Sequence, residues 1–238
     1  VVSHKGALDE VVRWVHRFVS LCGHSKVYLR SDDETASKAL TQALVGSACT
    51  EDLSITQQVA PTGSKPSQGG VERYIRRVEE QIRVMLVDIN SRGGSLATSS
   101  CAFDWLVRHA SFLLCRFNVS NGQTAFSRRN GYPYTSGLLQ FGETVYSLLS
   151  YHRLLPKVAP RWILGIWLGR SELSDGHLVF VAGVGTKQYR AVRRLPVEAR
   201  WSLSLSSIVG VPLKPLLTVQ TPILPAMSGT QSSEVLMP

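Results

Sequence analysis

Two acidic positions in this sequence are placed where carboxylates could share a divalent metal ion. Asp32 follows the short β-favouring run at 26–30, and Glu72 opens a strongly periodic stretch directly after a segment rich in Gly, Pro and Ser. Magnesium prefers hard oxygen ligands, and phosphodiester chemistry gains most from two ions, which need more than two carboxylates. The pair therefore points to metal-dependent phosphodiester chemistry, with at least one further ligand required.

The surrounding pattern predicts elements that would position both acids. Apolar spacing predicts helices at 7–22, 35–46 and 71–89, and strands at 26–30 and 53–59, with a mobile loop at 61–70. Asp32 then lies at the carboxyl end of a strand and Glu72 at the start of a helix. Open α/β sheets place their active sites at such positions. The same residues also fit a purely structural role, in which Asp32, Asp33 and Glu34 cap the next helix and Glu72 is a first-turn acid favoured by the helix dipole.

The rest of the chain divides by composition. A further helix at about 96–117 completes a first unit at 1–118, and a connector with turn signals covers 119–142. Short β-prone runs at about 143–149, 161–168, 177–182 and 187–194 predict a small all-β domain at 143–201, a barrel or meander. Residues 202–238 have two charges and no period, and we expect a disordered tail there.

Several motifs resemble one family, the integrases of retroviruses and retrotransposons. The run Ser67-Gln68-Gly69-Gly70-Val71-Glu72 resembles the loop that precedes the last catalytic Glu, and the strand ending in Ser31-Asp32 resembles the one that carries the second catalytic Asp. The 39 residues between Asp32 and Glu72 are close to the family's usual gap. Segments at 105–110, 138–143 and 165–169 resemble the copia-type retrotransposon group.

This resemblance implies a ribonuclease H-like core, followed by a small SH3-like barrel, and dependence on Mg²⁺ or Mn²⁺. It implies trimming of element DNA ends and their joining to target DNA, with a homo-oligomer as the full enzyme and DNA as its partner. Integration implies a nuclear location after a cytoplasmic polyprotein or particle stage. Asp32 and Glu72 are then both the catalytic residues and the metal ligands.

Two departures from the family pattern weigh against activity of this segment alone. Asp33 and Glu34 stand where the family has Asn-Gly, and they add negative charge beside the metal site. The family's first Asp lies on a strand well before the second, whereas only 31 residues precede Asp32 and Asp9 falls in a predicted helix. We expect that strand, and any zinc-binding N-terminal domain, to lie upstream or to be lost. A catalytically inactive relic or domesticated nucleic-acid-binding module is therefore the alternative function.

The basic residues suggest where nucleic acid would bind. The net charge is +9, and residues 121–201 hold 11 Lys or Arg against four acids, as expected for a polyanionic partner. Gln68 and Arg76 match family positions that reach the DNA end, and Arg73 and Arg77 adjoin them. On helix 71–89 these arginines could instead pair with Glu79 or Glu80.

A second basic stretch lies in the small β domain. Arg190, Arg193 and Arg194 alternate with less polar residues on one predicted strand, which resembles a DNA-binding strand but also fits an edge strand protected from aggregation. Trp162, Trp167 and Trp201 fit a core role better than base stacking. The four cysteines have no spacing typical of zinc ligands, and no apolar run is long enough for a membrane span.

Overall fold

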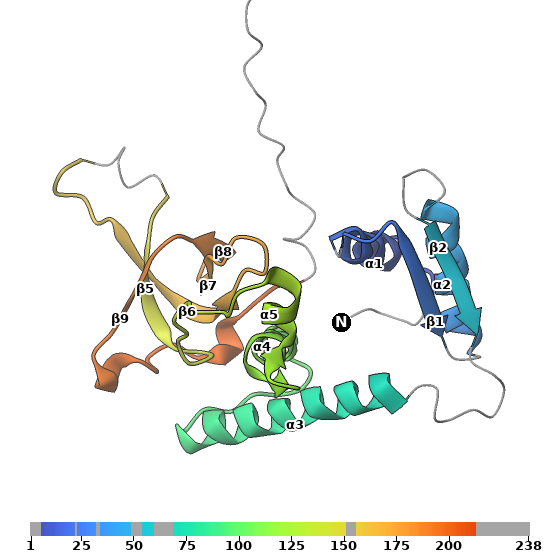
Figure 1. The fold of residues 1–238 in the computed structure, drawn as a ribbon. Helices are drawn as coiled ribbons and strands as arrows, with labels where there is room; N and C mark the ends of the chain where they lie inside the picture. The colour runs from blue at the N-terminus through green and yellow to red at the C-terminus, as the bar shows by residue number, and fades with distance from the viewer. Residues whose placement is uncertain are drawn as a thin grey trace, which may run out of the picture.

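The protein is a mixed α/β chain with a five-stranded antiparallel sheet (Figure 1). The computed structural model describes residues 6–21, 23–31, 34–48, 54–59, 69–150 and 156–212. Its first elements are α1 (Asp9–Leu21), β1 (Lys26–Ser31), α2 (Thr35–Ala48), β2 (Ser54–Val59), α3 (Gly69–Ser91) and α4 (Cys101–Phe117). Then follow β3 (Val119–Ser120), β4 (Gln123–Thr124), α5 (Ala125–Asn130), β5 (Thr144–Leu148), β6 (Trp162–Arg170), β7 (His177–Val181), β8 (Gly185–Tyr189), β9 (Val192–Arg194) and the 3-10 turns η3 (Val197–Ala199) and η4 (Leu205–Ser207). Within the described residues, no helix combines the length and apolar character that crossing a bilayer requires.

The N-terminal part of the chain, up to Val59, is a parallel strand pair with two helices. β1 and β2 run parallel from the pair Lys26 and Ser54 to the pair Ser31 and Val59, and α2 connects them. Their apolar side chains alternate with polar ones, so that Val27, Leu29 and Ile55 share the face that packs on the helices. A small core gathers Val15, Val19, Val27, Leu29, Val45 and Ile55. The helices and strands predicted up to residue 59 are confirmed within a few residues at their ends.

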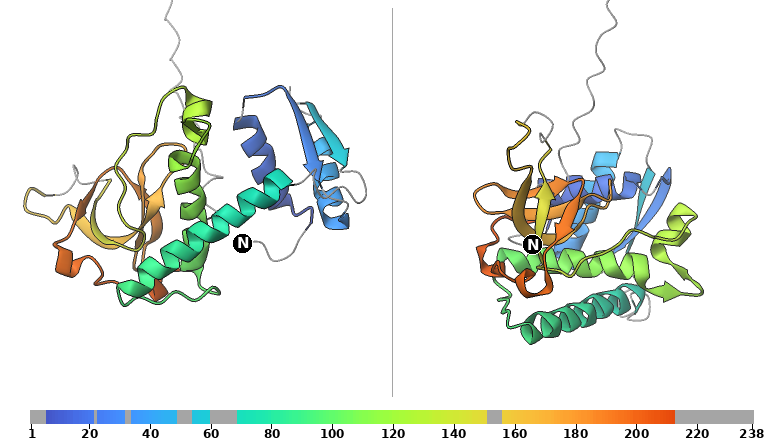
Figure 2. Two further views of the ribbon diagram at one scale, coloured as in Figure 1. Left: turned by 60° about the horizontal axis from the view of Figure 1, so that its bottom comes forward. Right: turned by 90° about the vertical axis from the view of Figure 1, so that its left-hand side faces the viewer.

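α3 confirms the predicted long helix, but only part of its apolar stripe is buried. Met85 and Ile89 pack on α4, whereas Val71, Tyr74 and Ile75 are 66%, 48% and 52% exposed. Figure 2 shows the N-terminal end of α3 extending beyond α4. The periodicity therefore predicts the helix correctly, while its first turns bury little of the stripe.

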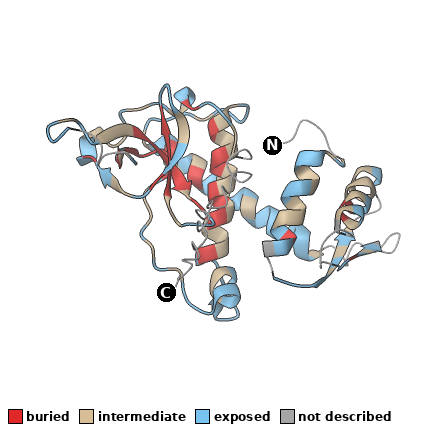
Figure 3. Cartoon of the chain, turned by 90° about the horizontal axis from the view of Figure 1, so that it is seen from above, coloured by how far each residue is buried: buried red, intermediate tan, exposed pale blue. Residues whose placement is uncertain are grey.

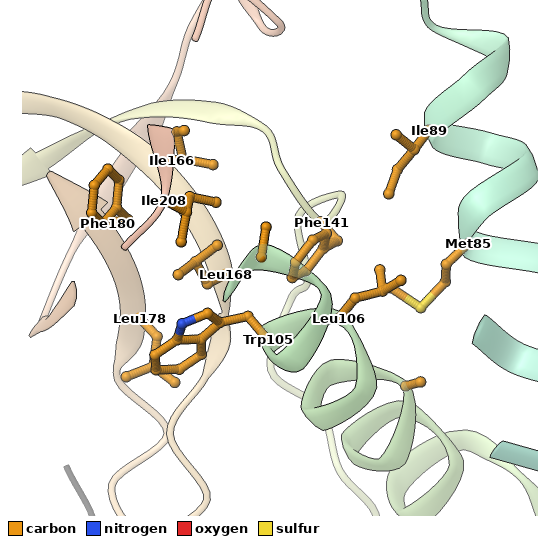
Figure 4. Close-up of a cluster of buried hydrophobic side chains, with 12 residues drawn as sticks. Met85, Ile89, Trp105, Leu106, Phe141, Ile166, Leu168, Leu178, Phe180 and Ile208 are labelled. Carbon is orange, nitrogen blue, oxygen red and sulfur yellow. The ribbon is translucent and has the colours of Figure 1, made fainter. Parts of the chain in front are cut away.

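The main core lies between α4 and the sheet (Figure 4). Trp105 and Leu106 of α4 are at most 2% exposed; Trp105 lies beside Leu168 and Leu178 of the sheet, and Leu106 points towards Met85 of α3. Each such side chain contributes on the order of 2 kcal/mol through its removal from water. Figure 3 shows this burial concentrated where α4 meets the sheet. This contact holds the sheet against α4.

The sheet has the strand order β8-β7-β6-β5-β9, in which neighbouring strands are antiparallel. The predicted strand at 187–194 is two strands, which lie at opposite edges although only residues 190 and 191 separate them. Four strand spacings of a flat sheet measure roughly 19 Å, whereas three peptide units span at most about 11 Å. The sheet is therefore strongly curled, and its two edges approach each other near Arg190. Val145, Trp167, Val179, Val181 and Tyr189 form the buried cluster of one face.

Residues 202–212 are not part of a disordered tail. Ile208 is 4% exposed in the main core, and Leu203 and Leu205 pack against it. The indole nitrogen of Trp105 donates a hydrogen bond of 2.9 Å to the carbonyl of Gly210. The apolar residues of this segment have no regular period, because they pack from irregular backbone, and so the sequence pattern missed them. The remaining tail, 213–238, lies outside the described residues.

The connector at 119–142 is also more ordered than its turn signals suggest. Thr124 caps α5 by accepting a hydrogen bond from the backbone of Ser127, and Gly131 ends the helix with a φ of +80°. Tyr134 and Ser136 then donate hydrogen bonds to the carboxylate of Asp175, which also pairs with Arg170. Burial and the hydrogen bond to Asp175 raise the pKa of Tyr134 to about 12. These contacts attach the connector to the turn between β6 and β7.

Candidate functional site

Glu72 occupies the first turn of α3, two residues after the glycines that begin the helix. Its side chain is exposed and has no hydrogen bond or ion pair with any described residue. The unpaired backbone N–H groups of a helix start favour a negative charge at this position. The carboxylate is therefore free to take a ligand from solution. This arrangement fits both a metal ligand and an ordinary first-turn acid.

The predicted partners of Glu72 in the site, Asp32 and Gln68, lie outside the described residues. The strand that leads to Asp32 is described, however, and its last residue, Ser31, is in register with Val59 at the end of β2. Because the strands are parallel, the chain leaves both at the same edge of the sheet. Ser31, which precedes Asp32, and Val59, the last residue of β2, are therefore about 5 Å apart.

In the purely structural alternative, the arginines near Glu72 pair with Glu79 or Glu80 of the same helix. The described contacts of α3 do not include such pairs for Arg73, Arg76 or Arg77. Arg73 donates to the carbonyl of Gly69 at 2.9 Å, within its own helix. Glu79 pairs with Arg83 at 3.3 Å, and neither Arg76 nor Arg77 has an ion pair with a described acid. These two side chains are exposed one turn beyond Glu72 and keep their charge available for a phosphate.

Arg194 has a structural role that the sequence analysis did not predict. Its guanidinium donates two hydrogen bonds, of 2.6 and 2.8 Å, to the carboxylate of Glu143, whose side chain is fully buried. Arg200 approaches the same carboxylate at 3.7 Å. The hydrogen bonds to Glu143 raise the pKa of Arg194. The pair ties β9 to the start of β5, and it uses the Nε and Nη2 donors of the guanidinium.

The other two predicted residues of this stretch face solvent. Arg190 is exposed at the crossing from β8 to β9 and has no ion pair with a described acid. Arg193 is exposed too, and its guanidinium carbon lies 4.3 Å from the ring centroid of Trp162. Trp167 is fully buried as predicted, whereas Trp162 and Trp201 are partly exposed and each stack with an arginine. The arginines that stack, Arg193 on Trp162 and Arg92 on Trp201, lie far from these tryptophans in the sequence, so no local sequence signal predicts the two pairs.

A cavity of about 580 Å³ lies away from the carboxylates. It is lined by the C-terminal end of α3, residues 93–97 and residues 201–206, with Arg92 stacked 3.7 Å from the Trp201 ring. Arg92 follows Glu72 by 20 residues along α3, or about 30 Å at the helical rise. The cavity and Glu72 therefore cannot belong to one site. Among the described residues, no group of three or more His, Cys, Asp or Glu side chains could hold a metal ion.

Comparison with known proteins adds a distant structural likeness. Neither a protein-family model nor a curated protein matches the sequence. Among solved structures, the chain is similar to a chain in the cryo-EM structure of a simian T-cell lymphotropic virus intasome in complex with the PP2A regulatory subunit B56 gamma. The two are 13% identical, the match covers 82% of this chain and 68% of that one, and the TM-score is 0.31. A likeness at this level does not establish a common fold.

Proposed function

We propose that this chain is part of a retroelement integrase, in which Asp32 and Glu72 hold Mg²⁺ or Mn²⁺ for the processing and joining of DNA ends. In this proposal the parallel unit of β1 and β2 belongs to a ribonuclease H-like core, and the curled sheet is an SH3-like barrel. The copia-type motifs named above motivate the choice of retrotransposon. DNA is the partner, and the full enzyme is a homo-oligomer that acts in the nucleus.

One observation carries the proposal. Ser31, the residue before Asp32, is in register with Val59 at the end of β2, and Glu72 is exposed and free of described partners. Twelve residues separate Val59 from Glu72, which is ample chain for the helix start to return to Asp32. Two carboxylates that meet there could hold one ion, and a third acid from another strand could hold the second.

In this proposal Asp32 and Glu72 hold the metal ion, and the polar and basic side chains nearby hold the DNA. The ion, when bound, supplies Lewis-acid stabilisation of the oxygen that leaves the phosphodiester. Asp32 and Glu72 position it, and their deprotonated form is needed for binding. Gln68, Arg73, Arg76 and Arg77 contact the DNA end next to Glu72, and Arg190 and Arg193 contact DNA on the sheet. Phosphate contacts of this kind provide affinity and register but no reading of sequence.

End joining tests this proposal in a chain extended upstream to include a strand with the first aspartate. With Mg²⁺, we expect the extended protein to join labelled oligonucleotide ends to a target duplex, and Glu72→Gln to abolish joining. Glu80→Gln, eight residues along the same helix, is the matched control and should join normally. Joining by Glu72→Gln at the unsubstituted rate would contradict the site.

A nucleic-acid-binding module without a reaction is the second candidate. It is favoured by the basic side chains that have no acidic partner among the described residues, Arg76, Arg77, Arg190 and Arg193. In that case the extended protein would bind DNA with strong salt dependence but would join no ends in Mg²⁺ or Mn²⁺. The same assay therefore separates the two candidates.

A further inference from the structure

The outer face of the curled sheet carries an arginine between two aromatic side chains. Tyr146 of β5 is in register with Leu164 of β6 and with Arg193 of β9. Residues in register on neighbouring strands share a face, and residues two apart on one strand do so as well. Trp162 is two residues from Leu164. Tyr146, Trp162 and Arg193 therefore lie on the same face.

These three side chains form one continuous surface, which we call the Tyr146 platform. β5 lies between β9 and β6, yet the guanidinium of Arg193 reaches the ring of Trp162 at 4.3 Å (strands labelled in Figure 1). The side chain of Arg193 must therefore cross over β5, beside Tyr146. Tyr146 is 44% exposed, whereas Val145 and Trp167 on the opposite face are fully buried. The platform thus presents a phenol ring and a flat guanidinium to solvent.

The charges around the platform attract a polyanion. Residues 143–201 contain four acids, and three of them are already engaged: Glu143 with Arg194 and Arg200, Glu172 with Arg108, and Asp175 with Arg170. Several basic side chains of the same region have no ion pair with a described acid. These are Lys157, Arg161, Arg190 and Arg193. The local field therefore favours a partner that carries many negative charges.

We propose that the Tyr146 platform binds the unpaired bases of a single-stranded nucleic acid. A base stacks on the ring of Tyr146 and on the guanidinium of Arg193, which Trp162 holds flat, and the neighbouring basic side chains neutralise the phosphates. The bases of a duplex are stacked on one another and cannot offer their faces. The platform is therefore selective for single strands. This inference rests on the proposed function in one respect, that nucleic acid is the partner.

The test compares three labelled ligands by fluorescence anisotropy on the full 238-residue chain. The ligands are an oligothymidylate, an abasic strand of equal length and a duplex. We expect Tyr146→Ala to weaken binding of the oligothymidylate about 5-fold or more, which is the loss of one stacked base. Binding of the abasic strand and of the duplex should change less than 2-fold, roughly within the spread of such measurements.

Two control variants test whether a loss of affinity is specific to the aromatic ring of the Tyr146 platform. Tyr132 is 61% exposed outside the sheet, and Tyr132→Ala should leave all three affinities unchanged. Tyr146→Leu keeps an apolar side chain on β5 without an aromatic face, and it should lose the same affinity as the alanine variant while keeping the thermal unfolding temperature of the parent.

Two results would overturn the inference. One is unchanged oligothymidylate binding by Tyr146→Leu, and the other is an equal loss on the abasic strand. The ratio of the affinity for the oligothymidylate to the affinity for the abasic strand does not depend on Glu72 or on a metal ion. A failure of the end-joining assay would therefore leave this inference standing, and the reverse also holds.

Discussion

Acidification from pH 7 to pH 5 should destabilise this protein through two buried histidines. His109 is 2% exposed and stacks between Phe112 and Phe141, and no described residue forms a hydrogen bond with its Nδ1. Burial, with a smaller effect of the positive charge of Arg108, lowers the pKa of His109 to about 4. His177 accepts a hydrogen bond from the Trp167 indole at 3.1 Å, and burial likewise lowers its pKa to about 4.

The sign of the effect follows from the two states. In the unfolded chain both histidines have a pKa of about 6.5, so at a pH between 4 and 6.5 the unfolded state binds more protons than the folded one. Stability that is present above pH 6.5 is therefore lost as the pH falls towards 4. The full difference corresponds to about 3 kcal/mol for each histidine, and about 2 kcal/mol of it is lost between pH 7 and pH 5.

Urea unfolding, followed by tryptophan fluorescence at pH 7 and pH 5, measures this loss. His109→Leu cannot titrate and gives up no hydrogen bond at Nδ1, so the free energy of unfolding should fall by about 2 kcal/mol less in the variant than in the parent over this pH range. The carboxylates titrate in both proteins and cancel in the comparison. An identical fall in the variant would refute the assignment of the pH dependence to His109.

Three further outcomes follow from the described contacts. Glu143→Gln should lower the free energy of unfolding by about 2 kcal/mol in urea titrations, because it weakens a buried bidentate pair with Arg194; no change would mean that the pair is not stabilising. Gly165→Ala should cost about 2 kcal/mol or more, since the added Cβ would lie 2.5 Å from the Phe180 carbonyl oxygen, and an unchanged melting temperature would contradict this packing. Arg76→Ala and Arg77→Ala should each reduce the slope of log affinity for duplex DNA against log salt by about 1, whereas Arg83→Ala, whose charge is paired with Glu79, should reduce it less.

Much of the element order could be predicted from the sequence because apolar spacing reports it directly. The spacing of apolar residues such as Met85 and Ile89 predicts α3, and β-prone runs between turn signals predict β1 and β5 to β7. Pattern alone could not show that residues 187–194 break at Arg190 and cross between the sheet edges, because register and curl depend on pairing partners far along the chain. Ile208 was missed for the same reason, since irregular backbone has no period.

The candidate site was predictable to a smaller extent. Residue type and spacing single out Glu72, and the helix start that presents it is confirmed. The bidentate pair of Arg194 with Glu143 and the shared face of Tyr146 and Arg193 arise from strand register, which the linear order of these residues does not reveal. A basic strand therefore looks uniform in sequence, although one of its arginines stabilises the fold and another is exposed.

The binding of Mn²⁺ to the 238-residue chain, followed by calorimetric titration, tests the central claim most directly. The account predicts one site that is lost in Asp32→Asn and equally lost in Glu72→Gln, while Glu80→Gln binds as the parent does. Undiminished binding in either of the first two variants would contradict the shared site.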